Sequence, residues 1–187
     1  SEGQYVSLGA AVETGSLVSR ASVDAAVRKA VRFLESRRSE LVAPRSSEKR
    51  HGAAPRRTYA ELALLALHRA GVPDSNPLKS ELLGLVRGRS IDSTYAAALQ
   101  AMALAEIDPI THHERIRLCA QILADSQCAN GQWDYGAALA LPDVPPTGRL
   151  KRRKEGPPSG DNSVSSYAIL GLHACAQAGV EVETSIV

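Results

Sequence analysis

Three residues near the end of the sequence have side chains that zinc enzymes use as ligands, namely Asp161, His173 and Cys175. A carboxylate, an imidazole and a thiolate can share one zinc ion. His173 and Cys175 are two positions apart in a predicted helix, so their side chains point to different sides. The adjacent residues His112 and His113 fall in the first turn of another predicted helix and are interpreted as solvated. We therefore expect buried helix residues at 173 and 175, no metal, no cofactor and no catalytic residue.

A second group of residues could form the rim of a pocket. Tyr59, Tyr95 and Tyr167 each stand at the start of a predicted buried helix, where their hydroxyls could edge a common pocket. Asp161 and Asn162, in the run Gly-Asp-Asn-Ser, could add a polar site there. Two structural interpretations stay open beside this one. The tyrosines could pack with only their polar tips at the rim, and the Asp161 side chain could be a helix N-cap.

The same tyrosines mark an internal repeat. Tyr59 and Tyr95 are 36 positions apart, and Tyr95 and Tyr167 are 72 positions apart, which is twice that spacing. The dipeptides Gly71-Val72 and Gly179-Val180 follow the first and third tyrosine at the same offset. A glycine at that place predicts a helix end with a left-handed residue. The sequence therefore predicts repeated units that each contain a helix.

Capping signals and hydrophobic patterns place these helices. Two pairs match the capping box of a helix start: Thr58 with Glu61, and Thr111 with Glu114. Asn76-Pro77 predicts a further helix that ends at Gly88. Helices that are apolar nearly all round alternate with amphipathic ones, and the amphipathic helix after Thr111 is expected to point Arg115, Arg117 and Asp125 outward. Another amphipathic helix carries the apolar stripe Val23, Val27, Val31 and Leu34. The predicted fold class is all-α, with helical hairpins in an inner and an outer layer.

Composition supports an all-α domain and excludes few functions. Only 4% of the 187 residues are aromatic and the net charge is +2. Three cysteines are an odd number at wide spacing, which argues against a disulfide framework. We expect an N-terminal extension over 1–22 and a repeat domain over 23–187, with loop insertions at 43–57 and 137–160. No apolar run is long enough to cross a bilayer, and the sequence leaves the compartment open.

One motif carries a family resemblance. Leu123, Gln127, Gly131 and Trp133 have the spacing of the QW motif of terpenoid cyclases. Together with the repeat, this motif resembles the α/α-toroid family of terpenoid cyclases and protein prenyltransferases, with a repeat like that of squalene-hopene cyclase. The resemblance implies an α/α toroid or partial toroid and identifies the chain as a catalytically degenerate bacterial member. The four motif residues are expected to clamp helix ends, through the glutamine amide, a glycine turn and the indole ring.

The residues that make this family reactive do not occur in the sequence. Terpenoid cyclases, which the chain resembles, use an Asp-x-Asp-Asp acid and a cavity lined with aromatic rings, whereas the aspartates here are scattered and there is one Phe and one Trp. The zinc pattern of the prenyltransferases is also missing. Our first hypothesis is a non-catalytic repeat module that binds a protein partner or an apolar ligand. As about three helix pairs can be read, the chain could be an open arc, a piece of a longer protein or a subunit of an oligomer.

Two alternatives remain. The chain could be part of a terpene cyclase or prenyltransferase whose catalytic residues lie outside this segment. It could also be a helical repeat that binds nucleic acid through two sets of basic loop residues: Arg45, Lys49, Arg50, Arg56 and Arg57, and then Arg149, Lys151, Arg152, Arg153 and Lys154. No aromatic residue alternates with these cations, so the sequence favours solvated loops over a nucleic-acid site.

Overall fold

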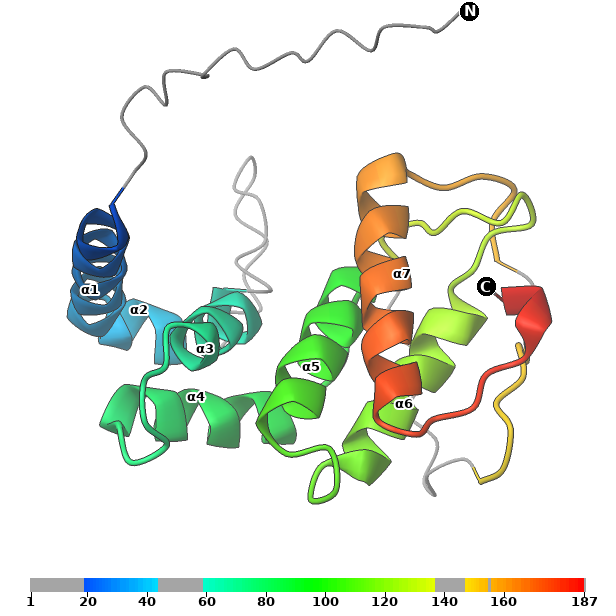
Figure 1. The fold of residues 1–187 in the computed structure, drawn as a ribbon. Coiled ribbons are helices and arrows are strands. Elements are labelled where there is room, and N and C mark those ends of the chain that lie inside the picture. The colour runs from blue at the N-terminus through cyan, green and yellow to red at the C-terminus, as the bar shows by residue number, and fades with distance from the viewer. Residues whose placement is uncertain (1–18, 44–58, 137–146, 155, 187) are drawn as a thin grey trace, which may run out of the picture.

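The structure is a computed structural model that describes residues 19–43, 59–136, 147–154 and 156–186, with the backbone alone at Tyr59 and Thr184. These residues form an all-α protein (Figure 1), as the sequence predicted, and within them no strand longer than an isolated bridge occurs. The elements are α1 Arg20–Ser36, α2 Arg38–Val42, α3 Tyr59–Arg69, α4 Pro77–Gly88, α5 Thr94–Ile107, α6 His113–Asp125, α7 Asn162–Gln177 and the short 3-10 helix η1 Thr184–Ile186.

Local signals in the sequence fix the ends of α3 and α4. Gly71 has a φ of +72°, and the amide of Val72 donates to the carbonyl of Leu67, which closes the end of α3. Asn76 caps α4, because its side-chain oxygen accepts hydrogen bonds from the amides of Leu78 and Lys79. The predicted bounds of α4 are therefore confirmed.

The helices at the centre approach each other closely because their contact residues are small. α5 packs against α3 on one side and α7 on the other, and α6 contacts both α5 and α7. At the crossing of α5 and α7, a Cβ atom added to Gly171 would lie 2.7 Å from the Cα of Ala98. Only glycine permits this separation. Among the described helices, none has the length and apolar content to cross a membrane.

The start and the end of α6 differ from the prediction. α6 begins at His113, and the Thr111–Glu114 capping box is wrong because the Asp108 side chain instead accepts the amide hydrogens of Ile110 and Thr111. The outward orientation expected for Arg115 and Asp125 is also wrong. Arg115 is partly buried and donates to the side-chain oxygen of the buried Gln100. Asp125 is 2% exposed, and its carboxylate accepts hydrogen bonds from the amide and the guanidinium of Arg153. A buried charge of this kind needs such a partner.

The first helix packs only lightly against the rest of the described structure. α1 stands at one edge of the molecule (Figure 1) and contains no buried residue. In its predicted apolar stripe, Val23 is 46% and Val27 is 37% exposed, whereas Val31 and Leu34 are partly buried against the core. α1 begins at Arg20, three residues before the expected domain boundary, because the Ser19 side chain caps it. Most of the predicted extension 1–22 and of the loop insertion 43–57 lies outside the described residues.

The second predicted loop insertion is tied to the body where the structure describes it. Leu150 is buried and forms a parallel bridge with Val182, next to the C-terminal η1. Three of the basic side chains pair with carboxylates on neighbouring segments: Arg149 with Glu181, Lys151 with Glu183, and Arg153 with Asp125. Three cations of this basic segment are therefore engaged in ion pairs within the protein.

Candidate functional site

The end of α6 is joined to the segment that follows it by Leu123, Gln127, Gly131 and Trp133. The indole nitrogen of Trp133 donates to the carbonyl of Leu123 over 2.7 Å, and the Trp133 ring is buried. The Gln127 amide donates to the carbonyls of Gly131 and Ile186, each over 3.2 Å. Gly131 has a φ of +87°, which suits the turn between these residues. These contacts hold backbone together, and none leaves a reactive group exposed.

The same loop positions the start of α7. The Asp161 amide donates to the carbonyl of Trp133 over 2.8 Å, and the Trp133 amide donates to the Ser165 hydroxyl over 2.8 Å. Gly160 lies directly on the loop, since a Cβ added there would be 2.3 Å from the Trp133 carbonyl oxygen. The loop 127–136 and the first turn of α7 are thereby held in one fixed arrangement.

Three tyrosines gather where this loop meets the starts of α5 and α7. The rings of Tyr95 and Tyr167 meet edge to face with centroids 5.0 Å apart, and those of Tyr95 and Tyr135 are tilted at 5.9 Å. Tyr135 is held by its backbone, because its carbonyl accepts from the Thr94 amide over 3.0 Å. Tyr135 is 55% exposed, and the other two are partly buried. We call Tyr95, Tyr135 and Tyr167, with the adjoining Ser163 and Asp161, the tyrosine face.

A short chain of hydrogen bonds orders this face. The Ser163 hydroxyl donates to the Asp161 carboxylate, so the Tyr95 hydroxyl donates to the Ser163 oxygen, which lies 3.0 Å away. The Asp161 side chain also accepts from the Val164 amide and caps α7, as one of the two interpretations predicted. The Ser163 hydroxyl first, and then the Val164 amide, lower the pKa of Asp161 below its ordinary value. An ionised carboxylate of low pKa is a weak base at neutral pH, so the chain orients Tyr95 and is poorly suited to remove a proton from a substrate.

Amide side chains extend the polar border of the tyrosine face. Asn130 donates to the Gln132 side-chain oxygen, and Gln132 donates to the Asn162 side-chain oxygen, each over 2.7 Å. Gln132 also accepts from the Gly160 amide over 3.3 Å. Asn162, a residue of the predicted rim, is exposed at the start of α7.

Four of the residues predicted to form a pocket rim lie near one another, and Tyr135, which the sequence did not single out, lies beside them. The pocket that they were predicted to edge stays a prediction. Tyr95, Tyr167, Asp161 and Asn162 share this end of the molecule, whereas the side chain of Tyr59 lies outside the described residues. Tyr135 lies outside the 36-residue repeat, which is why the repeat did not reveal it. Its signal in the sequence is its place two residues after the motif tryptophan, in Trp-Asp-Tyr-Gly.

The histidine and cysteine candidates do not converge. Cys175 is buried as predicted, and its thiol lies 3.7 Å from the carbonyl of Ile116. The burial predicted for His173 is wrong, because this side chain faces solvent from the uncovered side of α7. His112, expected to be solvated, is buried. Within the described ranges, no three His, Cys, Asp or Glu side chains are grouped so that they could hold a metal ion.

A buried polar network connects the central helices α3, α5 and α6. Glu61 in α3 and Gln100 in α5 are fully buried, and the Gln100 amide donates to the Glu61 carboxylate over 3.3 Å. Arg115 in α6 donates to the Gln100 oxygen over 2.8 Å, and Arg89 forms an ion pair with Glu61 over 3.4 Å. These polar groups satisfy one another, so the network specifies how α3, α5 and α6 meet.

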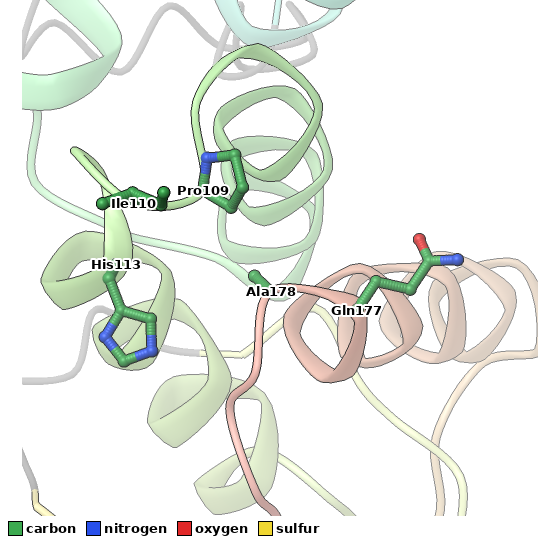
Figure 2. A pocket seen from close by; sticks show the side chains of 5 residues that line it. All are labelled: Pro109, Ile110, His113, Gln177 and Ala178. Atoms are coloured by element: carbon green, nitrogen blue, oxygen red, sulfur yellow. The ribbon is translucent and has the colours of Figure 1, made fainter.

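A shallow pocket of about 280 Å³ lies at the opposite end of α7 (Figure 2). It is lined by Pro109 and Ile110 on the turn after α5, by His113, and by Gln177 and Ala178 at the end of α7. Figure 2 shows the side chains of His113 and Gln177 pointing away from each other. Ile110 is 88% exposed. This open depression has no polar side chains that converge on one point.

Comparisons of the chain with protein-family models, with curated proteins and with solved structures found no match.

Proposed function

We propose that this chain is a non-catalytic helical-repeat module that binds a partner protein through the tyrosine face. The main support is the cluster of three tyrosine rings. The chain has five tyrosines, and three of them meet through Tyr95, which contacts both Tyr167 and Tyr135; the Tyr135 side chain is 55% exposed. Tyrosine offers a large, stiff contact area with a polar tip and is enriched in protein interfaces.

The tyrosine face is also preorganised. Hydrogen bonds fix Tyr95 through Ser163, and the backbone of Tyr135 through Thr94, before any partner arrives. A rigid site loses little conformational entropy when it binds. This order favours recognition of another molecule over a role in packing alone.

The open shape of the tyrosine face favours a protein partner over an apolar small-molecule ligand. Small-ligand sites usually bury about 70–90% of the ligand in a cleft, whereas the tyrosine face is open at Tyr135, which is 55% exposed, and is bordered by Asn130, Gln132 and Asn162. A polar border around aromatic residues is typical of a protein interface. An apolar ligand remains the alternative within the same binding function.

We also propose a family and an architecture for the chain. The clamp contacts of Gln127 and Trp133, and the packing of α3 on α5 and α5 on α7, support an open arc of terpenoid-cyclase and prenyltransferase-like repeats, a partial toroid. Under this proposal, catalytic residues of a longer enzyme would have to lie outside the segment. The ion pairs of Arg149, Lys151 and Arg153 support the preference against nucleic acid.

The test is a selection of peptides from a random phage-displayed library on the wild-type chain. We expect the selected peptides to bind the wild type and to lose about tenfold or more in affinity for Tyr135→Ala, because this change removes the exposed aromatic anchor. The matched control is Ile110→Ala, which removes an exposed side chain at the other end of α7.

Peptides that bind Tyr135→Ala as tightly as the wild type would refute the tyrosine face as the binding site. Native mass spectrometry of the purified chain tests the alternative. A co-purified mass of lipid size that Tyr135→Ala abolishes would replace the protein partner with an apolar ligand.

A further inference from the structure

Within the described segments that carry the tyrosine face, all formal charges have one sign. The segments that frame it are 91–98, 127–136 and 156–170, and their only charged residues are Asp92, Asp134 and Asp161. The chain as a whole has a net charge of +2, so these three segments are acidic in a slightly basic chain. Such local charge attracts partners of the opposite sign and speeds their association.

Two of these aspartates are fixed next to the tyrosines. The Asp134 side chain accepts the amide hydrogen of Tyr135 over 2.7 Å, and the Asp161 carboxylate connects to the Tyr95 hydroxyl through Ser163. The hydrogen bonds that Asp161 accepts lower its pKa, so it stays ionised at neutral pH. A carboxylate with more than one acceptor position can receive further donors beside these bonds.

The aromatic rings add a second attraction for cations. The face of a tyrosine ring is electron-rich and attracts an ammonium or guanidinium group that lies over it. Tyr135 is 55% exposed, which leaves ring surface accessible next to Asp134. A guanidinium is planar, so it can stack on a ring while its N–H groups reach a carboxylate, whereas an ammonium is a compact point charge.

We propose that the tyrosine face binds an arginine-bearing, extended segment of the partner protein, with a guanidinium stacked on Tyr135 and paired with the carboxylates of Asp134 and Asp161. This inference rests on the proposed binding function and names its partner class. It also explains why the aromatic residues and the acidic residues of these segments occur together. An apolar segment would gain nothing from the carboxylates and would bury them at a cost.

The experiment measures the fluorescence anisotropy of a labelled Gly-Arg repeat peptide titrated with the full chain. The comparison peptide carries citrulline in place of every arginine, which keeps the planar shape and removes the charge. We expect the arginine peptide to bind about tenfold or more tightly than the citrulline peptide, and its affinity to fall as salt is added.

Matched variants then locate the binding site. Tyr135→Phe should keep the affinity for the arginine peptide, because the ring remains, and Tyr135→Ala should lose about tenfold. Asp161→Asn keeps a capping side chain and loses the charge. It should weaken binding by about threefold to tenfold, whereas Glu114→Gln, an equal charge change on the exposed part of α6, should leave it unchanged. Asp134→Asn gives an independent second test of the carboxylate contribution.

Equal affinity for the arginine and citrulline peptides would overturn the inference. It would also be overturned if Asp161→Asn and Glu114→Gln weakened binding equally, which would indicate attraction by net charge alone. The phage selection separates this failure from a failure of the proposed function. Selected peptides that need Tyr135 but lack arginine would leave the binding function standing and refute the partner class alone.

Discussion

At the scale of single residues, His112 links stability to pH. Its imidazole is buried at the start of α6, where burial first and then the charge of Arg87 lower its pKa below 6.5, against a smaller opposing effect of Asp108. The unfolded chain therefore takes up a proton more readily than the folded one. The stabilising contribution is complete above the unfolded pKa of about 6.5 and is lost as the pH falls below it.

We predict that the free energy of unfolding decreases from pH 7 to pH 5 and that His112→Gln removes part of this decrease. The carboxylates of Glu106 and Asp161 have lowered pKa values, so their contributions persist to more acidic pH and do not mask the effect. Urea unfolding, followed by circular dichroism at several pH values, measures this pH dependence of the free energy of unfolding. An equal pH dependence in the wild type and the variant would contradict the role of His112.

The three thiols should be unreactive in the folded protein. Cys119, Cys128 and Cys175 are buried, and burial raises the pKa of all three, that of Cys119 to about 12. The thiolate is the reactive form, so little of it exists at pH 8. Ellman's reagent is expected to label the native chain far more slowly than the urea-unfolded chain, which should release three equivalents. Labelling of any one thiol in the native chain at the rate of the unfolded chain would contradict this burial.

Residue roles could be predicted where they depend on neighbours in sequence. The caps Asn76 and Asp161 and the turn at Gly71 are local, and the sequence contains all their partners. Asp125 and His112 were misplaced because their environments depend on distant residues. Arg153, which pairs with Asp125, is 28 residues away, and no helical pattern shows that contact.

At the scale of helices, the crossing of α5 and α7 depends on Gly171. We predict that Gly171→Ala lowers the free energy of unfolding by about 1–3 kcal/mol, because the added Cβ meets the backbone of Ala98 at 2.7 Å and the helices must separate. The matched control is Gly84→Ala in α4, where the added Cβ meets nothing within 4 Å. That change should stabilise the protein by about 0.5–1 kcal/mol through helix propensity.

Chemical denaturation of the two glycine variants, in the same buffer, measures the change in the free energy of unfolding that each one causes. Destabilisation by Gly84→Ala as large as that by Gly171→Ala would show that the loss is not specific to the crossing. The sequence predicted both helices but not this crossing, since a close approach depends on which faces meet. Glu61 and Gln100 are the polar positions of two otherwise apolar stretches of the sequence, and the structure pairs them.

At the scale of the whole molecule, stability is distributed unevenly. α1 contributes no buried residue, whereas Ile186 in the last helical turn is 1% exposed. We predict that the double change Val23→Ala and Val27→Ala in α1 lowers the free energy of unfolding by no more than about 1 kcal/mol. Ile186→Ala should cost about 2–5 kcal/mol, as a large buried side chain is lost from the core.

Thermal and urea unfolding of these two variants measure the difference. An α1 double variant that loses more stability than Ile186→Ala would mean that α1 is part of the cooperative core. The all-α class could be predicted from periodicity and composition, whereas the exposure of the apolar residues of α1 could not. An amphipathic pattern shows that a helix has an apolar face, but it does not show which element covers that face.

The position of Trp133 gives the protein an optical property. Trp133 is the one tryptophan of the chain, it is buried, and it stands two residues from Tyr135. Light absorbed by the three tyrosines can therefore pass to one nearby indole and leave as its emission. A molecule that settles on Tyr135 would change this transfer, so the unlabelled protein carries its own fluorescent reporter of binding.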